Sequence, residues 1–178
     1  MASQTIVLGG GCFWCTEAVF KEVRGILDVE SGYSNGRIER PTYEQVCNGT
    51  TGHAEVVKLT YDPDQISTRQ VLEIFFVVHD PTQLNRQGND VGTQYRSGIY
   101  YTSAEQKEVA DDLIRQLSQD KVFGKPVVTE VAPLANYWPA EEYHQDFFEK
   151  NPFQGYCLAV AAPKVEKFRK TFRELQKT

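Results

Sequence analysis

The segment Gly10-Gly11-Cys12-Phe13-Trp14-Cys15 carries the residues best suited to chemistry. Residues 5–8 before it form a short β-rich run, and apolar residues after it recur at helical spacing, which predicts Cys12 at or near a helix N-terminus. Unpaired N–H groups and the positive end of the helix dipole favour a thiolate there. A pKa about 1.5 below the usual 8.5 would leave the thiol half ionised near pH 7. The alternative interpretation of Cys12 is a small buried hydrophobe.

The spacing Cys12-x-x-Cys15 is compatible with three classes of protein. It could form the redox disulfide of a thiol–disulfide oxidoreductase, although such motifs usually hold small or polar residues between the cysteines. It could be half of a structural zinc site, but Cys47 and Cys157 form no second C-x-x-C. In a third class, Phe13 and Trp14 provide an aromatic surface beside the sulfur that would suit a methyl group or thioether.

The surrounding sequence predicts strands and helices without a break in composition. Mixed strands and helices indicate an α+β or α/β sandwich. Residues 37–52 and 80–96 are long polar stretches with glycine, and loops of that length are often functional. We expect strands at residues 5–8, 27–33, 55–61 and 127–131. We expect helices at 12–23, 71–78, 103–117, 139–148 and 163–175, with capping-box patterns at residues 67–70 and 103–106.

Length and composition restrict the class of protein. The 178 residues suit one domain, expected to span 1–178. A net charge of −5 disfavours binding to nucleic acid or to anionic membranes. Four cysteines are too few for a disulfide scaffold, and neither a signal peptide nor a membrane-spanning run is evident. We therefore expect a soluble, cytoplasmic protein with reactive cysteines, working as a monomer.

Several further segments carry a resemblance to a known family. Gly11-Cys12-Phe13-Trp14 resembles the signature of peptide-methionine (S)-S-oxide reductase, the A-type methionine sulfoxide reductase. The resemblance covers nearly the whole chain and implies an α+β, two-layer sandwich of ferredoxin-like type, with a mixed sheet, flanking helices and long irregular loops. The other matching segments, in order along the chain, are residues 31–33, 42–47, 51–57, 89–97, 143–145 and 151–152.

The resemblance implies reduction of methionine S-sulfoxide, free or in peptides and proteins, as a repair of oxidative damage, without a cofactor or metal. It also implies a role for each matching residue. Cys12 would attack the sulfoxide sulfur, and Glu55 would protonate the sulfoxide oxygen. Phe13 and Trp14 would line a pocket for the S-methyl group. Tyr33 and Tyr95 would donate hydrogen bonds to the oxygen, and Asp90 would hold the polar side of the pocket.

The chemistry makes a specific demand on Glu55. A sulfoxide oxygen leaves only when protonated, so Glu55 must be a carboxylic acid at neutral pH, with a pKa about 2 to 3 above its usual 4.3. An apolar site beside Trp14 would raise this pKa by desolvation, and a neighbouring Cys12 thiolate would raise it again. Reduction would leave a sulfenic acid on Cys12.

A second thiol must resolve that sulfenic acid. Cys157 ranks first, because residues 151–157 resemble a segment in which many relatives carry a resolving cysteine. Cys15 ranks second, since Cβ atoms one turn apart in a regular helix lie about 5–6 Å apart, whereas a disulfide needs roughly 3.5–4.5 Å. Cys47 ranks third. The external reductant is expected to be thioredoxin or another dithiol.

Three histidines complete the candidate set. His53 and His144 are expected to act as hydrogen-bonding struts more than as bases, and His79 is expected to be structural.

Overall fold

A six-stranded mixed sheet forms the centre of the molecule, which is described by a computed structural model for residues 3–177. The strand order is β7-β6-β1-β3-β2-β8. Neighbouring strands are antiparallel, except that β6 and β7 are parallel. The strands are β1 (Gln4–Gly9), β2 (Ile26–Ser34), β3 (Ala54–Tyr61), β6 (Gly98–Tyr101), β7 (Glu130–Pro133) and β8 (Trp138–Pro139).

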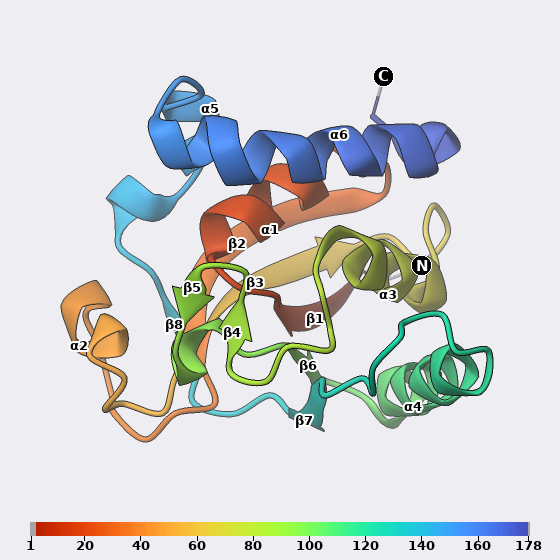
Figure 1. Cartoon of the computed structure of the whole chain (residues 1–178), viewed down its shortest axis with the longest axis horizontal. Coiled ribbons are helices and arrows are strands. Elements are labelled where there is room, and N and C mark those ends of the chain that lie inside the picture. The colour runs from red at the N-terminus through yellow and green to blue at the C-terminus, as the bar shows by residue number, and fades with distance from the viewer. Residues whose placement is uncertain (1–2, 178) are drawn as a thin grey trace.

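Helices gather mainly on one face of this sheet (Figure 1). Helix α1 packs on β2 and β3, and α6 packs on α1 and α3. No helix within residues 3–177 is long and apolar enough to cross a membrane. The helices are α1 (Phe13–Phe20), α2 (Tyr43–Cys47), α3 (Thr68–Val78), α4 (Ala104–Gln119), α5 (Phe147–Lys150) and α6 (Ala162–Thr171); the shorter elements are β4 (Arg86–Gln87), β5 (Asp90–Val91), the 3₁₀ turns η1 (Thr93–Tyr95), η2 (Glu142–His144) and η4 (Arg173–Leu175), and the π-helical turn η3 (Cys157–Ala161).

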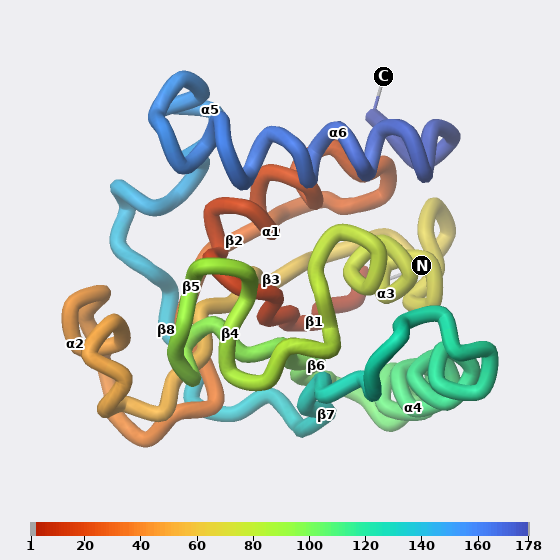
Figure 2. Tube along the Cα trace, in the orientation of Figure 1, coloured from red at the N-terminus to blue at the C-terminus, as the bar shows by residue number. Residues whose placement is uncertain are grey.

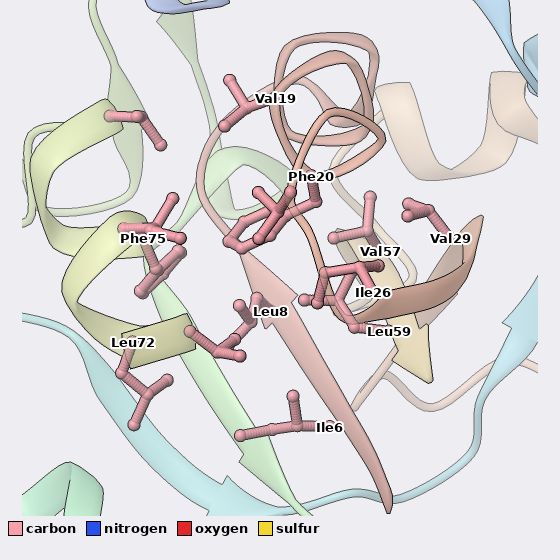
Figure 3. Close-up of a cluster of buried hydrophobic side chains, with 14 of the residues drawn as sticks. Ile6, Leu8, Val19, Phe20, Ile26, Val29, Val57, Leu59, Leu72 and Phe75 are labelled. Carbon is pink, nitrogen blue, oxygen red and sulfur yellow. The ribbon is translucent and has the colours of Figure 1, made fainter. Parts of the chain in front are cut away.

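Alternation along the strands sends side chains to two different cores. On β1, Ile6 and Leu8 face the helices, where they meet Phe20 of α1 and Phe75 of α3 (Figure 3). Val7, between them, faces a smaller cluster, against which residues 132, 134 and 137 at the end of β7 and in the chain after it pack. The same alternation on β3 places residues 55, 57 and 59 on the helix-covered face, which decides where Glu55 points.

Local signals predicted α3 well and α4 in part. At α3, Ser67 Oγ accepts from the N–H of Gln70 and the Gln70 side chain accepts from the N–H of Ser67, so the predicted capping box is present. At α4, Ser103 accepts from the N–H of Gln106. The Gln106 amide, however, reaches back to the backbone carbonyl of Thr5, so tertiary contact replaces the second half of the box.

Some element predictions are wrong. No single helix runs over residues 139–148: Trp138 and Pro139 pair with β2, and Asp146, with φ of 58°, separates η2 from α5. The strand expected at 127–131 begins only at residue 130, and β6 carried no strand signal that we recognised. On β2 an irregularity between Ile26 and Asp28 turns Leu27 outward, 58% exposed.

The chain after β8 brings distant sequence to the start of α1. In Figure 2 this segment rises from the sheet edge to α5 and returns as α6 along α1. Helix α1 contacts α5, η3 and α6. Residues 144–157 are therefore placed beside residues 12–15.

Candidate active site

Cys12 lies at the junction between β1 and α1. It is the N-cap of α1, with extended backbone dihedrals (φ −62°, ψ 129°), as the glycine–cysteine pattern predicted. The two glycines permit this sharp entry. A Cβ on Gly10 would lie 3.0 Å from the Phe75 ring, and Gly11 has a φ of +91°, which favours glycine. The Cys12 side chain is only 7% exposed.

Glu55 lies against the same helix start. It projects from the helix-covered face of β3 and is 1% exposed. Its Oε1 accepts the backbone N–H of Phe13 at 3.2 Å, while Oε2 is buried and has no hydrogen-bond partner. Burial, and then the charge of Asp90, raise the pKa of Glu55 from 4.5 to about 8. The group is therefore a carboxylic acid at neutral pH, held next to Cys12.

The prediction of a resting Cys12 thiolate is wrong. Burial raises the pKa of the Cys12 thiol well above its usual value, and Glu55 and then Cys15 raise it further. The backbone N–H of Trp14 acts in the opposite direction but does not offset the desolvation. A helix N-terminus favours the thiolate and apolar burial disfavours it, and at Cys12 the burial is the larger effect. Cys12 is consequently a thiol in the resting protein, and the raised pKa of Glu55 owes nothing to a neighbouring thiolate.

The phenols around Glu55 divide into two groups. Tyr33 lies directly opposite Glu55 on β2. Its hydroxyl already donates a hydrogen bond to Glu141 Oε1 at 2.7 Å. Burial raises the pKa of Tyr43 and Tyr95, and the Glu55 carboxyl nearby raises it further. Both phenols therefore remain proton donors. Tyr95 was predicted from sequence, whereas Tyr43 was not.

Aromatic rings enclose the start of α1. Phe13 is buried against Tyr33 and Tyr43, with ring centroids 5.7 and 6.4 Å apart. Trp14 stacks on Phe147 with centroids 3.7 Å apart and planes at 4°. The sequence predicted Phe13 and Trp14 beside the sulfur; in the structure Phe13 shares the buried cluster that contains Cys12, and Trp14 packs against that cluster. No signal in the sequence indicated that Phe147 would stack on Trp14.

His144 fixes the indole of Trp14. Its Nδ1 accepts the indole N–H at 3.0 Å, so in the neutral ring Nε2 carries the proton. Burial lowers the pKa of His144, which favours this neutral form. Nε2 is buried and has no partner. Glu141, which accepts from Tyr33 and from the Tyr43 N–H, lies on the same segment and was also missed by sequence reasoning.

The other two histidines are structural. His53 accepts the N–H of Gly36 at Nδ1 and its Nε2 lies 2.7 Å from the carbonyl of Ile38, so both ring nitrogens hold the loop after β2. His79 is buried, its ring nitrogens contact Phe75 and Ser97, and burial lowers its pKa to about 3. These contacts agree with the sequence interpretation of both residues.

The remaining cysteines and Asp90 differ in burial and in the groups that they contact. Asp90 acts electrostatically on Cys12 and Glu55 and hydrogen-bonds Tyr156. Cys157 is fully buried and clusters with Cys15 rather than with Cys12. Cys47 is exposed and hydrogen-bonds Tyr43 and Tyr95. The sequence predicted Asp90 at the site but not the packing of Cys157 on Cys15.

Together these groups define a thiol-based oxidoreductase site: a buried thiol, an adjacent proton donor, and further thiols close by. Comparison with known proteins agrees. The family model described as peptide methionine sulfoxide reductase matches residues 4–176. The peptide methionine sulfoxide reductases MsrA of Nautilia profundicola and Saccharolobus solfataricus are 58% and 56% identical, covering 97% and 95% of this chain and 98% and 94% of theirs.

Solved structures support the same assignment. Reduced Mxr1 from Saccharomyces cerevisiae matches with a TM-score of 0.81 at 35% identity, covering 90% of this chain and 91% of that one. Methionine sulfoxide reductase A of Corynebacterium diphtheriae matches with a TM-score of 0.78 at 36% identity, covering 89% and 79%. The chain belongs to the peptide methionine sulfoxide reductase family, and it is an oxidoreductase that reduces methionine sulfoxide.

Replacing Glu55 by glutamine should change how stability depends on pH. Because the folded state favours the protonated form of Glu55, the contribution of this residue to the free energy of unfolding is complete below pH 4.5. It is lost as the pH rises through about 8. Glutamine does not titrate, so the free energy of unfolding of Glu55→Gln minus that of the wild type should increase across this range by about 1.4 kcal/mol per pH unit. Urea denaturation at several pH values measures the difference. Glu166→Gln, at an exposed position on α6, is the control and should track the wild type; parallel curves for Glu55→Gln would contradict the raised pKa.

Proposed function

We propose that Cys12 attacks the sulfoxide sulfur while Glu55 protonates the sulfoxide oxygen. The observation that carries this proposal is the buried, partnerless Oε2 of a protonated Glu55 beside the Cys12 thiol. The substrate sulfur is reduced by two electrons and the Cys12 sulfur is oxidised by two, giving methionine and a sulfenic acid. As Cys12 attacks, it gives up its thiol proton, which replaces the proton that Glu55 has donated to the oxygen.

We propose that the aromatic pocket selects the substrate. Phe13 and Trp14 would hold the S-methyl group, since methyl groups and thioethers pack well on aromatic rings. Tyr95, supported by Tyr43, would donate to the oxygen, as a phenol adds a hydrogen bond without charge. Asp90 would hold the polar side. Tyr33, whose proton is held by Glu141, would donate to the oxygen only after releasing that contact.

The general-acid role makes Glu55→Gln the decisive variant. Loss of the transferable proton should lower reduction of methionine S-sulfoxide by more than about tenfold, the low end of general acid contributions. Alkylation of Cys12 should persist, because the thiol remains. Turnover of separated sulfoxide epimers, with dithiothreitol as reductant, gives the measurement. The wild type should consume the S epimer and leave the R epimer, and near-wild-type activity of Glu55→Gln would rule out the role.

For resolution we propose a relay from Cys12 to Cys15 and then to Cys157. Cys12 is the N-cap and Cys15 the N3 residue of α1, the backbone N–H of Cys15 donates to the carbonyl of Cys12 at 3.1 Å, and Cys15 acts electrostatically on the Cys12 thiol, which supports their proximity. The distance expected for a regular helix does not carry over directly, because Cys12 has extended dihedrals and lies outside the helix. Cys157 packs on Cys15, which supports it as the second acceptor. Packing thus favours Cys15 for the first step, although sequence ranked Cys157 first and Cys47 third.

Serine variants separate the steps of this relay. After one turnover without reductant, Cys15→Ser should accumulate the Cys12 sulfenic acid, because Cys157 packs away from Cys12. Cys157→Ser should stop instead at a Cys12–Cys15 disulfide. Trapping with dimedone followed by mass spectrometry distinguishes the two species, and Cys47→Ser is the control that should proceed normally. Prompt disulfide formation in Cys15→Ser would contradict the proposed order.

We further propose thioredoxin as the reductant, the cytoplasm as the compartment, and a monomer with a single catalytic domain spanning 1–178. Mxr1, a relative at 35% identity, has also been solved in complex with Trx2, which supports the partner. Four free cysteines suit a compartment that keeps thiols reduced. The order β6-β1-β3-β2, with α1 and α3 in the connections, supports the ferredoxin-like, two-layer classification.

A further inference from the structure

Resolution by Cys15 requires that its thiol lose a proton, and its surroundings oppose this. Cys15 is 1% exposed, so water does not reach it to accept the proton. Burial raises the pKa of its thiol. A thiol attacks as the thiolate, so a buried cysteine of this kind needs a proton acceptor within hydrogen-bond reach.

A hydrogen-bonded chain leads from Cys15 to a carboxylate. The Cys15 Sγ donates to the hydroxyl of Tyr156 at 3.5 Å, and that hydroxyl donates to Asp90 Oδ2 at 2.5 Å. The second distance is in the range of an O–H group donating to a carboxylate. Both bonds therefore point in one direction, from the thiol through the phenol to Asp90.

We propose that Tyr156 is a catalytic residue of the resolution step, passing the Cys15 thiol proton to Asp90. This inference rests on the proposed relay through Cys15. No tyrosinate forms on the way, because burial and the neighbouring cysteines raise the pKa of Tyr156 far above its usual value. The hydroxyl instead gives its own proton to Asp90 as it receives the one from Cys15.

The step balances in atoms and electrons. The Cys15 sulfur attacks the Cys12 sulfur, the S–S bond forms, and the S–O bond of the sulfenic acid breaks. Cys15 is oxidised by one electron equivalent and Cys12 is reduced by one. The departing oxygen takes up the proton delivered to Asp90 and leaves as water. Asp90 is suited to return it, because its charge acts on Cys12 as well as on Cys15.

The other charged and titratable groups around Cys15 do not replace this path. Lys164 on α6 lowers the pKa of the Cys15 thiol, but an ammonium group has no free lone pair with which to accept a proton. Cys157 raises it slightly and is itself buried in the same apolar cluster. Among the groups that act on Cys15, Tyr156 is the one that forms a hydrogen bond with its sulfur.

Tyr156→Phe tests the proposal with little change in packing. The ring, which meets Trp14 edge-on at 5.8 Å, is retained, and only the hydroxyl is lost. In a single turnover of methionine S-sulfoxide without reductant, methionine should appear within twofold of the wild-type rate. The Cys12–Cys15 disulfide should form more than about tenfold more slowly, with sulfenic acid accumulating meanwhile. The residual rate should rise steeply with pH, because Cys15 must then ionise directly.

Two matched variants and one further measurement complete the test. Asp90→Asn can still accept the Tyr156 hydrogen bond but cannot take its proton, so its disulfide step should slow relative to its methionine step. Tyr101→Phe on β6, outside the site, should leave both steps unchanged. The wild-type disulfide step should also be slower in deuterium oxide than in water, and this measurement does not depend on the folding of any variant. Equal rates in the two solvents would overturn the proposal.

The outcomes separate this inference from the proposed function. If the wild type releases no methionine, the proposed function itself fails. If methionine is released and Tyr156→Phe forms the Cys12–Cys15 disulfide at the wild-type rate, the proton path alone is overturned. Formation of a first disulfide between Cys12 and Cys157 in the wild type would likewise overturn it.

Discussion

The buried carboxyl of Glu55 beside the thiol of Cys12 is the constraint on which the site depends. Neither group can carry a charge there without a large loss of solvation, so both hold their protons in the resting protein. A substrate that brings a polar oxygen to Oε2 supplies the partner which that atom lacks. The burial that keeps Cys12 protonated at rest thus also keeps a proton on Glu55, which the proposed mechanism gives to the sulfoxide oxygen.

Three features of the fold enforce this burial. Alternation on β3 turns Glu55 toward the helices, and the glycines after β1 allow α1 to start directly over it. The segment from η2 to η3 then closes the site with His144, Phe147 and Tyr156. The thiols are arranged in sequence along the same helix start: Cys12 at the N-cap, Cys15 one turn on, and Cys157 packed against it.

Sequence reasoning singled out Cys12 and Glu55, which the structure brings together, because their signals are local or were carried by motifs. A strand followed by glycines and cysteine predicted the N-cap position of Cys12, and Ser67–Gln70 predicted the start of α3. The pKa of Cys12 could not be predicted, since it depends on burial by segments far away in the sequence. For the same reason the contacts of Glu141 and His144, and the fact that Cys157 lies nearer to Cys15 than to Cys12, emerged only from the tertiary structure.

The most direct test of the central claim is the titration of one carboxyl group. In the substrate-free wild type carrying ¹³C-labelled glutamate, the Glu55 resonance, assigned by its absence in Glu55→Gln, can be followed by NMR as the pH is raised. The account predicts a midpoint near 8. A midpoint near the ordinary value of 4.5 would mean that Glu55 is ionised at neutral pH and holds no proton to give, which would contradict the account.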